Sequence, residues 1–290
     1  MVTEQAYAKI NLTLHVTGQR ADGYHLLDSL VVFVGVGDVL SAKRTGIGAL
    51  TIEGPFGHDI PLGADNLVLR AAQAFDGADI TFSLVKNLPP ASGIGGGSAD
   101  AAAAIRAVLR LRAAGTVPAL TVNDQARLAD LGADVPVCLL SQPSRMRGVG
   151  EILEPVAVPA CWITLANPRV EVPTPAVFRA LTQKANPPMP EALPDWPDVA
   201  AFTAWLARQR NDLEGPARAI APVIGTVLAA LTATKGALLT RMSGSGATCF
   251  ALYATQALAE AGAAQLRAKH PDWWVAPAPV LAGNPIPRQL

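Results

Sequence analysis

Apolar and polar residues alternate along the first third of the chain in the way expected of β-strands. Residues 7–16 (YAKINLTLHV) alternate over several positions, and residues 30–36 form a β-branched run typical of a buried strand. Residues 49–53 indicate a weaker strand, and residues 79–85 (DITFSLV) alternate again. The segment TGQRADGYH at 17–25 carries the glycines and the aspartate of a turn.

Helical composition follows these strands and dominates the second half of the chain. We expect helices over 67–75, from Ser98 onward, and over 123–131, 199–208, 217–233 and 255–269. Ser98 has the chemistry of an N-cap, with Asp100 favourable in the first turn.

The second half adds a strand over 161–166 and a glycine-rich turn after Arg241 that leads into another strand. Residues 183–198 contain five prolines and predict an irregular surface segment. Because strands and helices mix without strict alternation, the pattern favours an α+β fold with two lobes.

The amino-acid composition limits the classes of partner that the chain is expected to bind. Half of the 290 residues are hydrophobic and 16% are charged, with 23 basic and 23 acidic side chains, so a folded core is expected. Zero net charge argues against a nucleic-acid surface and favours a small molecule. The N-terminus is interrupted by charge, and the uncharged run 219–234 is too short to span a membrane. We therefore expect a cytoplasmic protein with no membrane or nucleic-acid partner.

The cysteines and histidines indicate no metal centre. Three widely separated cysteines form no CxxC pair, and four histidines show no HExxH spacing. We therefore predict no protein-held metal site and no disulfide framework.

The most distinctive segment is KNLPPASGIGGGS at 86–98, which lies between a predicted strand and a predicted helix. Glycines let the backbone approach an anion closely, and a helix N-terminus offers free N–H groups with positive partial charge. The segment lacks the lysine of GxxxxGK[ST], and Ser98 stands where GxGxxG requires glycine. A tight turn feeding an ordinary helix is the alternative. Four glycines in five positions, at 93 and 95–97, favour anion binding.

Two motifs point to a known family. PPASGIGGGSADAA at 89–102 resembles the phosphate-binding motif of the GHMP kinases, and SGSGATCF at 243–250 is similar to their third motif. AYAKINLTLHVTGQRADGYHLLDS at 6–29 resembles the branch whose acceptor alcohol carries cytidine diphosphate. Further matches are DNLVLRAA at 65–72, LGADVPVCL at 131–139, VEVPTPAVF at 170–178 and NDLE at 211–214. The resemblance extends from Ala6 to the tail NPIPRQL.

This resemblance implies a fold and a reaction. The expected fold is the two-lobed α+β GHMP-kinase fold, with a ribosomal-protein-S5-like ATP-binding lobe over 1–155 and a ferredoxin-like substrate-binding lobe over 156–290. The active site would lie in the cleft between the lobes. The implied reaction is ATP-dependent phosphorylation of the 2-hydroxyl of 4-diphosphocytidyl-2-C-methylerythritol, in the non-mevalonate route to isoprenoids. Mg²⁺ would arrive with ATP, and the chain would be a monomer or a weak homodimer.

The resemblance also decides the role of two charged residues. Lys9 lies in an apolar strand, where its head either has a charged partner or reaches water. Asp134 lies in the turn GADVP, where a capping role is common. By resemblance, the two meet at the substrate hydroxyl, with Asp134 as general base and Lys9 as its partner. Asn11 lies on the same strand face as Lys9 and would orient the same substrate.

By resemblance, ATP would be held by the glycine loop and residues beside it. The expected nucleotide contacts are Asn66, Lys86, Pro90, Gly93, Ile94, Gly95, Gly96, Gly97 and Ser98. Lys86 has the alternative of a solvated lysine at a strand end. The family usually has a second serine where this chain has Ala99, so a side-chain contact with Mg²⁺ is in doubt.

For the acceptor, the resemblance implies a cytosine stacked between Tyr24 and Phe178, with His25 hydrogen-bonded to the base and Thr174 and Pro175 shaping the pocket. The alternatives are a loop tyrosine folded onto the core and a phenylalanine that begins a helix core.

Two rival functions stay open. The first is a kinase for homoserine or mevalonate, but these acceptors have no base to stack between two aromatic residues. The second is a non-catalytic nucleotide-binding or RNA-binding module, against which the zero net charge argues.

Overall fold

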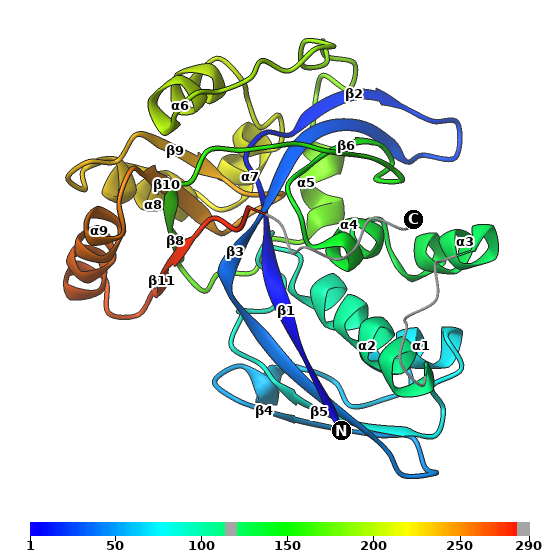
Figure 1. The fold of residues 1–290 in the computed structure, drawn as a ribbon. Helices are drawn as coiled ribbons and strands as arrows, with labels where there is room; N and C mark the ends of the chain where they lie inside the picture. The colour runs from blue at the N-terminus through cyan, green and yellow to red at the C-terminus, as the bar shows by residue number, and fades with distance from the viewer. Residues whose placement is uncertain (114–120, 283–290) are drawn as a thin grey trace.

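Two β-sheets form the frame of the molecule (Figure 1). This computed structural model describes residues 1–113 and 121–282; the tail NPIPRQL lies outside the described residues. Over these residues the first sheet has seven strands and the second has four. The strands of the first are β1 (Val2–Asn11), β2 (His15–Gln19), β3 (His25–Arg44), β4 (Ala49–Glu53), β5 (Ile80–Val85), β6 (Ser144–Gly148) and β7 (Ile152–Pro155). Those of the second are β8 (Trp162–Asn167), β9 (Leu239–Met242), β10 (Cys249–Tyr253) and β11 (Trp274–Pro279).

The long strand β3 organises the first sheet, since β1, β2, β5 and β6 all pair with it antiparallel. The parallel pair β4–β5 extends one edge, and β7 follows β6 at the other. The second sheet has the order β11-β8-β10-β9 and is antiparallel throughout.

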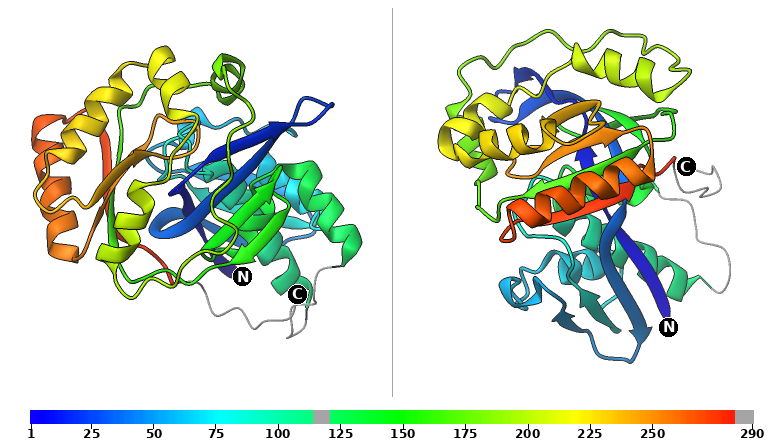
Figure 2. Two further views of the ribbon diagram at one scale, coloured as in Figure 1. Left: turned by 90° about the horizontal axis from the view of Figure 1, so that it is seen from above. Right: turned by 90° about the vertical axis from the view of Figure 1, so that its left-hand side faces the viewer.

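Helices cover both sheets. Those associated with the first sheet are α1 (Leu67–Ala74), α2 (Gly96–Arg112), α3 (Val122–Leu131) and α4 (Val135–Leu140), with a 3₁₀ turn at Gly57–Asp59. In the second half they are α5 (Thr174–Ala180), α6 (Val199–Ala207), α7 (Glu214–Ile220), α8 (Val223–Thr232) and α9 (Gln256–Lys269). Helix α2 packs along β1 and β3, and α9 lies across the outer face of the second sheet (Figure 2).

The two sheets share a core, and β1 is the strand between them. Ala6 packs into the core that α1 and α2 cover, whereas Ala8 and Ile10 join a second cluster with Ile163 and Phe250 of the second sheet. Because both faces of β1 are buried, any polar side chain on this strand requires a partner inside the protein.

The predicted elements are largely confirmed, with the α+β class. The strand over 49–53 and the helices over 67–75, 123–131, 199–208 and 255–269 occur within one or two residues of their predicted ends, and residues 183–198 form no regular element.

Three local predictions are wrong. Residues 7–16 are not one strand, because Leu12 and Thr13 both donate to Leu30 O and separate β1 from β2. Residues 217–233 form two helices that meet at Pro222. Ser98 is not an N-cap: helix α2 begins three residues earlier than expected, with Gly95 as N-cap at φ +65°, a left-handed conformation natural to glycine.

The proline-rich segment is attached to the first sheet by a buried ion pair. Arg145 on β6 donates to both carboxylate oxygens of Asp28 on β3, at 2.8 and 2.7 Å. The Arg145 guanidinium also donates to Glu191 O at 2.7 Å, and Asp28 accepts from Met189 N at 2.8 Å. Both charged side chains are 2% exposed, so the segment and the pair depend on each other.

We predict that Arg145→Met lowers the free energy of unfolding by about 3–5 kcal/mol, because it leaves the Asp28 carboxylate buried and unpaired. Arg147→Met, two residues along the same strand, is the control. Arg147 pairs with the exposed Glu154 and Glu191, and its loss should cost less than about 1 kcal/mol. Urea denaturation followed by circular dichroism measures both values, and equal costs would contradict the assignment.

Candidate active site

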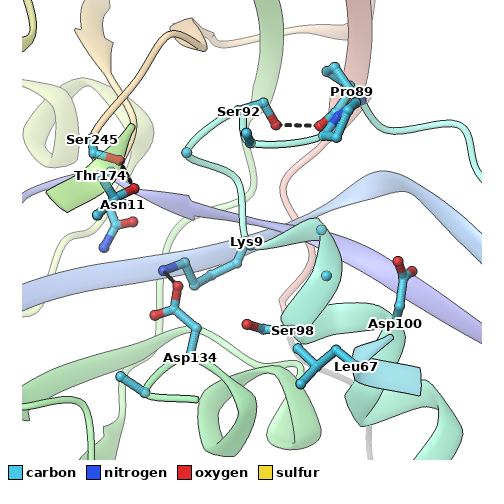
Figure 3. Close-up of a pocket in the computed structure, with 18 of the residues that line it drawn as sticks. Lys9, Asn11, Leu67, Pro89, Ser92, Ser98, Asp100, Asp134, Thr174 and Ser245 are labelled. Atoms are coloured by element: carbon cyan, nitrogen blue, oxygen red, sulfur yellow. Dashed lines mark hydrogen bonds and ion pairs between the residues drawn. The ribbon is translucent and has the colours of Figure 1, made fainter. Parts of the chain in front are cut away.

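A cavity of about 630 Å³ lies where the two sheets meet, and residues from both halves of the chain line it (Figure 3). Of the predicted site residues, the structure places these around the cavity: Lys9, Asn11, Asn66, Lys86, Pro90, Gly93, Gly95, Gly96, Gly97, Ser98, Asp134, Thr174 and Phe178. Ile94, Tyr24, His25 and Pro175 are not part of its lining.

Lys9 and Asp134 form an ion pair at the centre of the cavity, with 2.6 Å between Nζ and Oδ2. The Lys9 side chain is 4% exposed, so the alternative of a head that reaches water is wrong. Asp134 is the N-cap residue of α4, but its carboxylate makes no capping hydrogen bond. The carboxylate is 32% exposed and is therefore available both to Lys9 and to a ligand in the cavity.

The glycine loop brings the N-terminus of α2 to the same space. The first helical hydrogen bond runs from Ala99 N to Gly95 O at 2.8 Å, so the N–H groups of Gly96, Gly97 and Ser98 have no partner within the helix. The Ser98 side chain projects toward the Lys9–Asp134 pair (Figure 3). An anion placed here meets free N–H groups and the positive end of the helix.

The four positions of the loop are occupied by glycine for different structural reasons. At Gly93, φ is +74° and a Cβ would lie 2.5 Å from Ser243 O; at Gly95, φ is +65°. At Gly96 a Cβ would lie 3.2 Å from the Lys86 ammonium. Gly97 has an ordinary φ, and a Cβ there would meet nothing within 4 Å. The protein fold therefore explains three of the glycines, whereas Gly97 keeps open the space above the helix N-terminus.

Lys86 is not a solvated lysine at a strand end. Its ammonium lies 2.5 Å from Asp38 Oδ2 and 2.6 Å from Asp100 Oδ2, and all three side chains are buried. Burial alone would lower the pKa of Lys86, but the Asp100 and Asp38 charges outweigh it and raise that pKa. Burial raises the pKa of Asp100, and the charge of Lys86 offsets only part of the rise. The sequence analysis predicted Lys86 near the nucleotide but missed both carboxylate partners.

Asn66 is also engaged by the protein. Its Oδ1 caps α1 by accepting from Val68 N at 2.9 Å, and its Nδ2 donates to Pro61 O at 2.8 Å. It therefore lines the cavity mainly as a shaped wall. Ala99, where the family usually has serine, is 2% exposed and packs in the core, so a hydroxyl there would not face the cavity.

The far end of the cavity is less polar. Leu14, Leu27 and Phe178 line it together with Thr174 and Ser245, whose hydroxyl oxygens are 2.7 Å apart. Asn11 donates to Ser29 Oγ at 2.8 Å, whereas its buried Oδ1 has no partner. A buried acceptor without a donor fits a ligand hydroxyl or N–H group.

The predicted aromatic residues are arranged differently from expectation. His25 stacks on Phe178, with ring centroids 4.6 Å apart and planes inclined by 25°. Burial, with the nearby charge of Lys184, lowers the pKa of His25, so its ring is neutral at pH 7. Tyr24 is 61% exposed in the turn between β2 and β3.

The site lacks a reactive thiol and a protein-held metal cluster. Cys138 lies behind Gly95, and burial raises the pKa of its thiol to about 12, so it is protonated at neutral pH. In the described ranges 1–113 and 121–282, no three His, Cys, Asp or Glu side chains form a metal-binding group. Nor does any helix there combine the length and apolarity needed to cross a membrane.

Other residues of the site were not predicted from the sequence. Ile60, Pro61 and Leu67 give the cavity an apolar end beside the glycine loop. Asn211, quoted only as part of NDLE, donates from Nδ2 to Met242 O and Gly244 O. Asn211 could have been singled out from the sequence, because it is a polar residue within a motif that matches the family.

Two parts of the chain match family descriptions. Residues 66–142 match the N-terminal domain of the GHMP kinases, and residues 190–272 match the C-terminal domain.

Full-length relatives are similar over nearly the whole chain. A 4-diphosphocytidyl-2-C-methyl-D-erythritol kinase of Cereibacter sphaeroides (strain ATCC 17029 / ATH 2.4.9) is 58% identical, with 94% of this chain and 97% of the relative covered. The kinase of the same name from Paramagnetospirillum magneticum is 51% identical, with coverages of 96% and 98%.

Solved structures of related kinases have a similar fold. A crystal structure of 4-(cytidine 5'-diphospho)-2C-methyl-D-erythritol kinase aligns with a TM-score of 0.75 and 33% identity, covering 98% of this chain and all of the other. Homoserine kinase from Cytophaga hutchinsonii aligns with a TM-score of 0.62 and 19% identity, covering 96% and 93%, a likeness of fold alone. The expected two-lobed α+β kinase fold is confirmed.

Proposed function

The chain belongs to the GHMP kinase family, among its 4-diphosphocytidyl-2-C-methyl-D-erythritol kinases, and from this premise we propose that it phosphorylates the 2-hydroxyl of that cytidylated alcohol with ATP. The reaction belongs to the non-mevalonate route to isoprenoids. The observation that carries the proposal is the Lys9–Asp134 pair, which faces the open N-terminus of α2 across one cavity.

The nucleotide end would bind ATP in two parts. The N–H groups of Gly96, Gly97 and Ser98 hold phosphate oxygens, because they have no partner within the helix. Ile60, Pro61 and Leu67 offer an apolar wall for the adenine. Asn66, Lys86 and Pro90 line this end, and the Lys86 ammonium, held by Asp38 and Asp100, supports Gly96.

The charge balance of the cavity fits a metal ion that arrives with the nucleotide. Two lysines line the cavity, and both are paired with carboxylates; Asp65, Asp100 and Asp134 line it as well. Phosphates entering alone would find no unpaired lysine among the residues described around the cavity. The Ser98 hydroxyl is an oxygen donor of the kind Mg²⁺ prefers. When bound, Mg²⁺ would offset the negative charge of the phosphates.

Asp134 and Lys9 would act on the acceptor hydroxyl. Asp134 accepts its proton, since the carboxylate is free of capping bonds and is partly exposed to the cavity. Lys9 keeps the carboxylate oriented and offsets the charge that develops as the proton leaves. The hydroxyl oxygen then attacks phosphorus in line with the departing ADP oxygen, without a covalent enzyme intermediate.

The far end would recognise the acceptor. Asn11 Oδ1 accepts from an acceptor hydroxyl, and the Thr174–Ser245 pair offers a further hydroxyl donor. Cytosine would pack against Phe178, with His25 as its hydrogen-bonding partner and Pro175 fixing the start of α5. Tyr24 would fold in from the β2–β3 turn to cover the other face of the base.

We expect turnover with Mg·ATP only when the acceptor is 4-diphosphocytidyl-2-C-methyl-D-erythritol, because the other candidates have no base to stack on Phe178. Coupled detection of ADP, with this alcohol, methylerythritol phosphate, mevalonate and homoserine compared in parallel, measures it. Equal turnover of mevalonate or homoserine would contradict the acceptor assignment while leaving the kinase reaction intact.

Asp134→Asn should lower kcat by about 10²–10⁴-fold, because the amide cannot accept the hydroxyl proton. The dissociation constant of ATP should change little. The control is Asp130→Asn, an exposed residue near the end of α3. Steady-state kinetics and equilibrium ATP binding test both variants, and an unchanged kcat for Asp134→Asn would remove this residue from the chemistry.

Gly97→Ala should weaken ATP binding at least 10-fold, because its methyl group enters the space above the helix N-terminus. The free energy of unfolding should stay within about 1 kcal/mol of wild type, since alanine is the better helix former. Gly215→Ala is the matched control: Gly215 is likewise the second residue of its helix, α7, with nothing within 4 Å of a Cβ. Calorimetric titration with ATP measures both, and equal affinity of the two variants would argue against the phosphate site.

A further inference from the structure

One buried hydroxyl joins the glycine loop to strand β1. Ser243 Oγ donates to Gly93 O at 2.9 Å and accepts from Asn11 N at 3.1 Å. Ser243 is 0% exposed and lies in the turn between β9 and β10. The hydroxyl therefore connects three segments that are far apart in the sequence.

The two loops pack backbone against backbone around this hydroxyl. A Cβ on Gly93 would lie 2.5 Å from Ser243 O, and a Cβ on Gly244 would lie 2.7 Å from Gly93 O. Both glycines also have positive φ, +74° and +55°. Side chains at either position would push the loops apart, so the short contact through Ser243 depends on them.

Asn211 holds the Ser243 turn from the other side. Its Nδ2 donates to Met242 O at 2.8 Å and to Gly244 O at 2.9 Å, the carbonyls on either side of Ser243. Its Oδ1 accepts from Leu213 N at 3.0 Å, which fixes the amide orientation. The hydroxyl is thus presented by a turn that is itself anchored to the start of α7.

A second link between the same two segments is the hydrogen bond from Lys9 N to Ile94 O, at 2.9 Å. The Ser243 bridge attaches the loop to β1 at a second point, Asn11, two residues along the strand. The loop is thus held to the strand at both Gly93 and Ile94.

We infer that Ser243 is a positioning residue: its hydroxyl aligns β1, which presents Lys9 and Asn11 to the acceptor, with the loop that holds the phosphates. This inference rests on the proposed function. Phosphoryl transfer depends on alignment of the attacking oxygen with phosphorus, and a misplacement of about 1 Å can cost about 10²-fold in rate. Ser243 does not line the cavity, so its effect should appear in kcat and not in binding.

The test compares Ser243→Ala with Ser144→Ala. Ser144 is also 0% exposed and donates one hydrogen bond to a backbone carbonyl, that of Gln142, but it lies on β6 outside the cavity lining. For Ser243→Ala we expect kcat to fall about 10–100-fold. ATP affinity and acceptor KM should change less than about threefold, since the groups that bind both substrates remain. ADP formed per phosphorylated acceptor should rise above the wild-type ratio, because a misaligned acceptor lets water compete.

Each outcome has a separate meaning. If Ser243→Ala keeps the wild-type kcat and the wild-type ratio of ADP to phosphorylated acceptor, the inference is overturned. It is also overturned if Ser144→Ala loses as much kcat as Ser243→Ala while the two variants have equal thermal stability. If wild type phosphorylates a different alcohol, the proposed acceptor fails, and the same comparison is made with that alcohol. If Ser243→Ala does not fold, Ser243→Cys keeps a hydrogen-bond donor at this position, weaker and somewhat larger than the hydroxyl. Its kcat should then fall with unchanged ATP affinity, and a wild-type kcat would overturn the inference.

Discussion

A lysine buried in a strand that is covered on both faces is the constraint on which this site depends. Lys9 lies on β1, between the core under α2 and the core shared by the two sheets. A buried ammonium requires a carboxylate, and Asp134 at the start of α4 supplies it at 2.6 Å. The pair therefore ties α4 to β1, and it places a carboxylate without a capping role at the centre of the cavity.

A second buried lysine, Lys86, lies under the glycine loop and is also paired with carboxylates. Lys86 is held between Asp38 and Asp100, so its ammonium braces β3 and α2 and is not free to reach into the cavity. Both cavity-lining lysines are thus already neutralised by the protein. For an anion, the described lining of the cavity then offers the backbone N–H groups of the helix N-terminus and no unpaired lysine. The positive charges of Lys9 and Lys86 are thus already positioned by the fold before any ligand binds.

Local structure was predictable where one segment decides it. The strand over 49–53 and the helix over 255–269 follow from alternation and composition, and the Lys9–Asp134 contact followed from resemblance to a family. The helix start at Gly95 was missed because serine is the commoner cap, and only the left-handed backbone of Gly95 allows the earlier start. The Ser243 bridge was not predictable, since it joins residues 150 and 232 positions apart and depends on how two loops pack.

The two ends of the cavity differ in how they are built, and this difference bears on acceptor choice. The proposed nucleotide end comes from consecutive segments of the first half, around the glycine loop and the start of α1. The proposed acceptor end combines β1, the β2–β3 hairpin, α5 and the Ser243 turn, and residues of the hairpin and α5 pack in the core of the second half. Leu14 and Val16 join that core together with Val177 beside Phe178. Substitutions in α5 or the hairpin can therefore change the shape of the acceptor end. The phosphate loop and the Lys9–Asp134 pair should stay in place, because the contacts that hold them lie on the opposite face of β1.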